Sequence, residues 1–177
     1  MKTRIRLPLI LVAASLGLIG CSTINSVVGI KKPPPCPYAA SLNNADRLVR
    51  FTGAGHDLTD VAFDAKIAKI TGDCGVNENL ISVTMKIDFV AQRGQALSGD
   101  QAPFSYIVAI LDPAGQVIAR QVFATGIVFS GKPRAGISEE LDQEIPLQAG
   151  YRAQDYQIYV GFELTKDELA YNRTLVR

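Results

Sequence analysis

The chain contains one histidine, no tryptophan and three cysteines among its 177 residues. Most zinc sites need three or four His or Cys ligands, so this composition excludes nearly all of them. The 18 Lys and Arg residues are balanced by 17 Asp and Glu residues, which argues against nucleic acid as a partner and against a polybasic grip on anionic lipid. Hydrophobic residues reach 47% and charged residues only 20%, which excludes intrinsic disorder over most of the chain.

The first twenty residues have the pattern of an export sequence. Lys2, Arg4 and Arg6 form a basic head, and residues 7–19 form an apolar run that ends at the small Gly20. A run of thirteen residues is too short to span a hydrocarbon core of roughly 30 Å, which needs about 20 helical residues. The pattern predicts a cleaved signal peptide over residues 1–20, leaving enough chain for one folded domain.

The end of this segment, Leu18-Ile19-Gly20-Cys21, resembles the lipobox of bacterial lipoproteins. The resemblance implies that the Cys21 thiol takes a diacylglycerol thioether, that the chain is cleaved before it, and that the new amino terminus is acylated with palmitate or a similar chain. It also implies a periplasm-facing lipoprotein of the outer membrane. The usual signal for inner-membrane retention is an Asp directly after the lipidated cysteine, and this chain has Ser22 there. Inner-membrane retention stays open, as does an ordinary cleaved signal with a chance cysteine.

Residues 21–35 are expected to form a tether between the lipidated cysteine and the domain at 36–177. Pro33, Pro34 and Pro35 favour an extended and stiff backbone. An apolar cluster within the tether, at Val27, Val28 and Ile30, leaves docking on the domain or on the membrane surface as an alternative.

Cys36 and Cys74 remain after lipidation of Cys21. In an oxidising compartment such as the periplasm, two thiols favour a disulfide bond. The alternative is a metal or redox pair, but the separation of the two residues is far from C-x-x-C and the chain has a single histidine.

Alternating apolar and polar residues predict a series of strands, each with one buried face. A turn with a proline at its second position and a glycine at its end, Asp112-Pro113-Ala114-Gly115, predicts a hairpin. Thr165 is expected to cap a short terminal helix, and residues 43–51 to hold a helical turn. The predicted strands cover residues 38–42, 61–68, 81–89, 104–111, 116–127, 137–145 and 156–164.

Six or seven short strands with almost no long amphipathic helix predict an all-β fold, an antiparallel β-sandwich of about seven strands. Tyr156, before the last strand, resembles the tyrosine corner of immunoglobulin and fibronectin type III domains, and the resemblance implies that type of sandwich. The absence of tryptophan removes the buried indole of antibody-type domains. A closed, lipocalin-like barrel is the alternative.

Few residues are candidates for chemistry. His56 lies beside Asp57 in a glycine-containing loop. It could act as a general base or be an ordinary solvated loop residue, and no nucleophile motif accompanies it. Glu140, Asp142 and Glu144 share one side of a strand at steps of about 6.5–7 Å, which suits a cation site, a carboxylate hydrolase or a charged face that discourages edge pairing.

A second group of candidates is aromatic. The last 27 residues hold a concentration of tyrosines that suits either a recognition surface or ordinary packing. They are Tyr151, Tyr156, Tyr159 and Tyr171.

The sequence therefore predicts a lipid-anchored periplasmic protein that acts as a non-catalytic binding or scaffolding module for an envelope protein complex. The expected partners are the membrane, through the lipid anchor, and an envelope protein, and no cofactor is expected. Two alternatives remain: a carrier of a small apolar ligand or lipid, and a hydrolase that uses the acidic strand.

Lipidation at Cys21 is directly testable. Cells fed radiolabelled palmitate should incorporate label into the wild-type protein and not into a Cys21→Ser variant, because only the thiol can form the thioether. A Cys36→Ser variant is the control and should keep the label. Unlabelled wild-type protein, or a mature protein that still begins at Met1 by mass spectrometry, would contradict the prediction.

Overall fold

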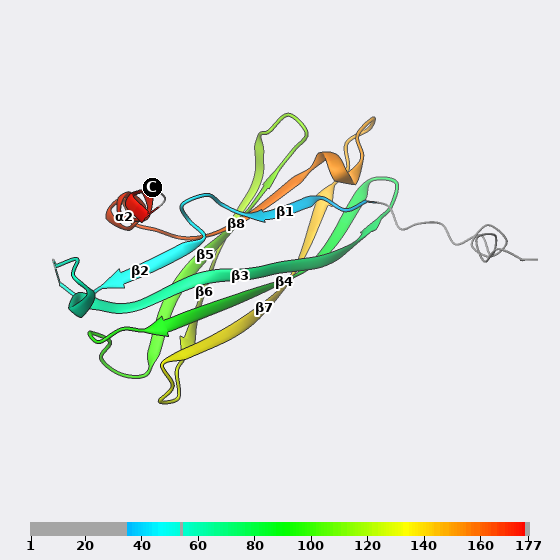
Figure 1. The fold of residues 1–177 in the computed structure, drawn as a ribbon. Coiled ribbons are helices and arrows are strands. Elements are labelled where there is room, and N and C mark those ends of the chain that lie inside the picture. Colours follow the sequence, from blue (N-terminus) through cyan, green and yellow to red (C-terminus); the bar gives the residue numbers. More distant parts are fainter. Residues whose placement is uncertain (1–34, 54, 176–177) are drawn as a thin grey trace, which may run out of the picture. The chain divides into compact units, whose positions relative to one another are not determined.

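Two four-stranded β-sheets pack face to face in the computed structural model of the chain (Figure 1). The structure describes residues 35–53 and 55–175. The predicted signal peptide, Cys21 and the tether up to residue 34 lie outside the described residues. The described residues belong to one compact unit. The predicted all-β sandwich is confirmed, with eight strands in place of about seven.

Strands that are consecutive in the sequence are divided between the two sheets. Sheet A has the order β1-β8-β5-β6 and sheet B the order β2-β3-β4-β7. All neighbours pair antiparallel except β1 and β8, which are parallel. The elements are β1 (Tyr38–Ser41), β2 (Arg47–Phe51), β3 (Val61–Val76), β4 (Leu80–Arg93), β5 (Gln101–Leu111), β6 (Val117–Val128), β7 (Arg134–Pro146), β8 (Gln157–Phe162) and the terminal helix α2 (Lys166–Leu175).

The core lies between β4 of sheet B and β5 and β8 of sheet A. The alternation predicted for residues 81–89 is confirmed, since the apolar residues of β4 are buried and the polar ones between them mostly exposed. Phe89 of β4 lies 5.2 Å from Phe104, 5.0 Å from Tyr106 and 5.6 Å from Phe162 between ring centroids. Each such aromatic pair adds about 0.5–1.5 kcal/mol beyond the burial of its area.

Strand β3 extends well past the predicted residue 68. The pairing of β3 with β4 shifts between Ile67 and Lys69. Ile67 lies opposite Phe89 and Lys69 lies opposite Asp88, so Ala68 is an extra residue in β3. A β-bulge of this kind moves the following residues to the other face. The inward positions change from Phe63 and Ala65 to Ile70 and Cys74, and the simple alternation ends although the strand continues.

The helical turn predicted for residues 43–51 is wrong. Asn43 to Asp46 form a turn, and residues 47–51 are the strand β2, paired with the first half of β3. Leu48 and Val49 are both buried although they are consecutive, which is why the segment shows no strand periodicity.

Two local predictions are confirmed. In the hairpin between β5 and β6, the Oδ1 atom of Asp112 accepts hydrogen bonds from the amides of Ala114 (2.9 Å) and Gln116 (2.8 Å). At the start of α2, the Oγ1 atom of Thr165 accepts from the Glu168 amide at 3.2 Å while the Glu168 carboxylate accepts from the Thr165 amide at 2.8 Å. This reciprocal arrangement is a capping box.

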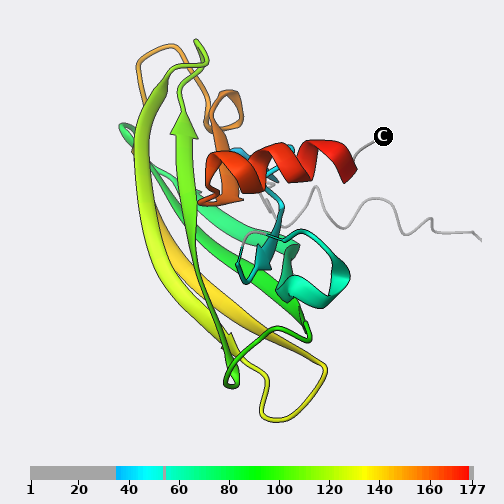
Figure 2. The ribbon, with the colours of Figure 1, turned by 90° about the vertical axis from the view of Figure 1, so that its left-hand side faces the viewer.

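Helix α2 packs beside β2, on the side of the molecule opposite β6 and β7 (Figure 2). The buried Asn172 side chain donates to the backbone carbonyls of Asn44 (2.8 Å) and Arg47 (2.6 Å). Arg50 of β2 pairs with Glu168 at 2.9 Å. The helix thereby covers the outer edge of sheet B.

The predicted Cys36–Cys74 disulfide bond is present, with 5.6 Å between the Cα atoms. Cys36 precedes β1 of sheet A, and Cys74 belongs to β3 of sheet B. The bond therefore joins the two sheets at the point where the chain enters the domain.

Removal of this bond should lower stability substantially. The chain-entropy model gives about 4 kcal/mol for a loop of this length. We expect the free energy of unfolding of a Cys36→Ala/Cys74→Ala variant, measured by urea denaturation, to fall by that order. Reduction of the wild type should reproduce the loss and leave the variant unchanged. An unaltered urea midpoint after reduction would show that the bond does not contribute.

Candidate functional site

The four edges of the sandwich differ in how they are protected. An unpaired edge strand exposes backbone amides and carbonyls that can pair with another chain, and proteins protect such edges with short strands, charges or covering elements. Edge strand β1 has only four residues, and β2 is covered by α2. Edge strand β7 carries the exposed Glu140, Asp142 and Glu144. These three edges each have a device against pairing.

The fourth edge, β6, is the least protected, although part of it contacts β7 of the other sheet. It has twelve residues without proline, and Arg120 is its only charged residue. Four of its apolar side chains are between 42% and 60% exposed: Val117, Ile118, Val122 and Val128. Arg120 lies 3.8 Å from Glu163, so its charge is partly balanced. The second side of β6 pairs with no strand in the described part of the chain. We call this feature the β6 edge.

Behind the β6 edge, side chains of β6 contact Tyr106 of β5 and Glu139 of β7. Phe123 of β6 stacks on Tyr106 with ring centroids 5.2 Å apart, and Thr125 donates to the Glu139 carboxylate of β7 at 2.6 Å. The buried Tyr106 hydroxyl has no hydrogen-bond partner among the described residues. Burial, followed by the negative charge of Glu139, raises the pKa of Tyr106 to about 12.

The acidic row of β7 is confirmed as one exposed face of the strand. It lies opposite β4, where Thr84 donates to Asp142 at 2.7 Å and Lys86 faces Glu140. Within residues 35–53 and 55–175, no three His, Cys, Asp or Glu side chains gather closely enough to hold a metal ion. The structure thus does not bring the three carboxylates together into a cation site.

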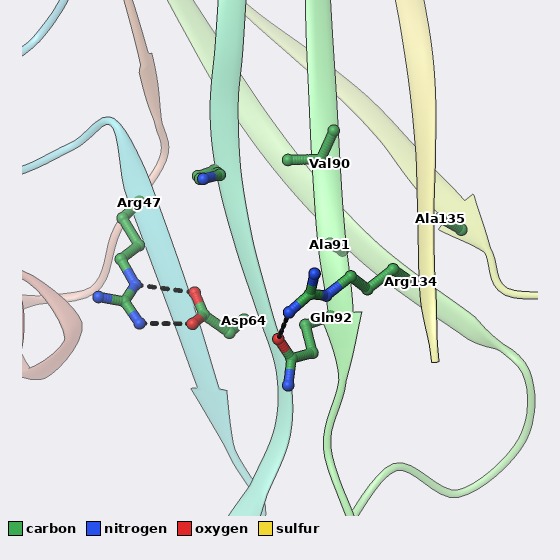
Figure 3. Close-up of a pocket in the computed structure, with 8 residues that line it drawn as sticks. Arg47, Asp64, Val90, Ala91, Gln92, Arg134 and Ala135 are labelled. Carbon is green, nitrogen blue, oxygen red and sulfur yellow. Dashed lines mark hydrogen bonds and ion pairs between the residues drawn. The ribbon is translucent and has the colours of Figure 1, made fainter. Parts of the chain in front are cut away.

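A hollow of about 680 Å³ lies on the outer face of sheet B (Figure 3). Arg47 of β2 donates two hydrogen bonds to Asp64 of β3, at 2.8 and 2.5 Å. Arg134 of β7 donates to the Gln92 side chain of β4 at 3.4 Å. The hollow is lined by Arg47, Asp64, Lys66, Val90, Ala91, Gln92, Arg134 and Ala135.

The other sequence candidates are dispersed. His56 is exposed and packs against Phe51 at 4.8 Å between ring centroids, with Tyr171 of α2 at 6.0 Å. Tyr156 is fully buried, and its hydroxyl accepts from the Gln148 amide at 3.0 Å. Tyr159 donates to Gln157 at 2.9 Å on the outer face of sheet A. Of these candidates, only His56 and Tyr171 lie close together, both against Phe51.

Comparison with protein-family models and with curated proteins gave no match to this chain. Among the described residues, none of the helices has the length and apolar character needed to cross a membrane.

Sequence patterns did not reveal the β6 edge or the hollow. The apolar residues of β6 predicted a strand, but its place at the edge depends on pairing with β5 alone. The hollow joins side chains from four strands, and 68 positions separate Lys66 from Arg134 in the sequence. The run of uncharged residues around Arg120 is the one feature that pointed to a poorly protected strand.

The state of Tyr106 yields a pH prediction. Because its pKa is higher in the folded chain than the ordinary value of about 10, the unfolded chain loses this proton first, and the free energy of unfolding should decline between about pH 10 and pH 12. In a Tyr106→Phe variant this decline should be smaller. At pH 7 the variant should be about 1 kcal/mol more stable, because it removes an unpaired buried hydroxyl.

Urea denaturation at a series of pH values measures both effects. A Tyr159→Phe variant is the matched control, since the Tyr159 hydroxyl has a hydrogen-bond partner at the surface. An alkaline decline of the same size in the wild type and in Tyr106→Phe would contradict the assignment.

Proposed function

We propose that this chain is a lipid-anchored, non-catalytic binding or scaffolding module of the bacterial envelope. The β6 edge is the observation that carries the proposal, because its second side pairs with no strand among the described residues, and a long apolar strand of this kind is a place for another strand to pair. The lipobox-like sequence at Cys21 supports an anchor on the periplasmic side of the outer membrane. An anchored domain meets its partner at a raised effective concentration, so a modest interface is sufficient.

The proposed partner is an extended segment of an envelope protein that adds to sheet A beside β6. In strand addition, backbone hydrogen bonds give affinity and alternate side chains give specificity. Ile118 and Val122, on the outer face of sheet A, supply apolar contacts for an incoming strand. Arg120 between them selects against a basic residue at the position that it faces.

A second copy of this chain fits the edge less well than another protein. Pairing of β6 with β6 across a two-fold axis would also bring the neighbouring β7 strands of the two copies toward each other. Each β7 strand carries the row of Glu140, Asp142 and Glu144, and like charges that face each other across strands are destabilising.

The sandwich itself is proposed to be of the immunoglobulin or fibronectin type III kind. Strand β4 pairs with β7 and β5 pairs with β8, which matches the B–E and C–F pairs of that topology. The hydrogen bond from the Gln148 amide to Tyr156, just before β8, supports a tyrosine corner. The parallel β1 lies where that topology has its last strand, G.

Site-specific photo-crosslinking in intact cells tests the partner. A photoreactive residue at Val122 should give one adduct of constant mass, heavier than the chain by the mass of another envelope protein. Ser82, exposed at the centre of sheet B, is the control position and should not give that adduct. An Ile118→Lys/Val128→Lys variant should abolish the Val122 adduct, because lysines on an edge discourage strand addition.

Both substituted positions are exposed, so the variant is expected to fold, and circular dichroism checks this. The absence of any reproducible Val122 adduct would overturn the proposal. An adduct of twice the mass of the chain would instead assign the β6 edge to self-association.

A further inference from the structure

The hollow on sheet B concentrates positive charge in a negatively charged domain. Residues 35–175 contain 12 Lys and Arg against 17 Asp and Glu, a net charge of −5. The hollow nevertheless has three cations, Arg47, Lys66 and Arg134, and one carboxylate, Asp64. If the charged residues of this domain were distributed at random, the net charge of the hollow would be expected to be negative.

The single carboxylate is already committed. Both Asp64 oxygens accept hydrogen bonds from Arg47, and this contact raises the pKa of Arg47, mainly through the hydrogen bond. Lys66 and Arg134 form no ion pair with any carboxylate in the described part of the chain. Two positive charges in the hollow are therefore left without a counter-charge.

The pairing of β2 with β3 makes this arrangement unfavourable in the empty hollow. Arg47 lies directly opposite Lys66, and like charges at directly opposite positions destabilise a sheet. On its other side Lys66 faces Val90, which offers no compensation. Asp88 lies opposite Lys69 rather than Lys66, and it accepts a hydrogen bond from Ser138 at 2.5 Å. A bound anion would relieve the repulsion between Arg47 and Lys66.

The remaining lining indicates the kind of anion. The side chain of Arg134 extends from β7 across β4 to Gln92, with Asp64 and Arg47 beyond (Figure 3). An arginine guanidinium binds two oxygens of a phosphate in a fixed geometry, and a lysine adds a point charge. Val90 offers an apolar side chain to the rest of a ligand, whereas the side chains of Ala91 and Ala135 pack toward the core.

We propose that this hollow is a binding site for a phosphomonoester dianion held by Lys66 and Arg134. Its two negative charges match the two uncompensated cations. Arg47 stays paired with Asp64 and orders the β2 side of the site. The body of the ligand, whether a soluble metabolite or a lipid, lies beside Val90.

Isothermal titration calorimetry with the purified full-length chain in nonionic detergent, at constant ionic strength, tests the site with inorganic phosphate. We expect saturable binding at millimolar phosphate. A Lys66→Ala/Arg134→Ala variant should bind at least about tenfold more weakly, a loss of about 1.4 kcal/mol. A Lys132→Ala/Lys166→Ala variant removes two exposed cations elsewhere and should bind as the wild type does.

Two further titrations distinguish the sources of the phosphate. Glucose 6-phosphate against glucose represents a soluble ligand, and dihexanoyl phosphatidic acid against dihexanoyl phosphatidylcholine, below micelle formation, represents a lipid headgroup. The phosphomonoester that binds more tightly shows whether the natural ligand is a soluble metabolite or a lipid. Its binding should require Lys66 and Arg134.

Melting curves confirm that the variants fold, and single Lys66→Gln and Arg134→Gln variants should each show part of the loss. The proposal is overturned if wild-type protein shows no saturable phosphate binding, or if the Lys66→Ala/Arg134→Ala variant binds as tightly as the wild type. It is also overturned if the Lys132→Ala/Lys166→Ala control loses as much affinity.

Discussion

The burial of Phe89 against Phe104, Tyr106 and Phe162 is the contact on which the rest of the structure depends. It brings β4 of one sheet against β5 and β8 of the other. A fully buried phenylalanine contributes about 1.5–3 kcal/mol relative to an exposed one. Strands β4 and β5 lie inside their sheets, and β1, β2, β6 and β7 form the edges.

This arrangement leaves interaction to the edges and outer faces. Because the inner faces are filled by one apolar cluster, the features that remain available are the β6 edge and the hollow on sheet B. They lie on different sheets, so a strand added beside β6 and an anion bound near Lys66 would not compete for the same residues. The Cys36–Cys74 bond joins both sheets at the start of the described domain.

Local patterns predicted the fold where each strand keeps one buried face. Ile81 to Phe89 alternate without interruption, and the structure buries every second residue. The prediction stopped early at Ala68, because the bulge there reverses the faces of β3, and it missed β2, because Leu48 and Val49 are buried side by side. The Cys36–Cys74 pair was predictable because a disulfide follows from residue type and compartment rather than from strand order.

The sequence by itself indicated the buried face of strands such as Ile81 to Phe89 and the place where the hairpin of Asp112 to Gly115 turns. The Cys36–Cys74 pair followed from it once Cys21 was assigned to the lipid anchor. Only the tertiary structure decided that β6 is an open edge and that Lys66 and Arg134 share one hollow. The physical reason is that alternation specifies which face of a strand avoids water but not which strand lies beside it. Neighbours in a sheet are chosen by hydrogen bonds and packing between segments that are far apart in the chain.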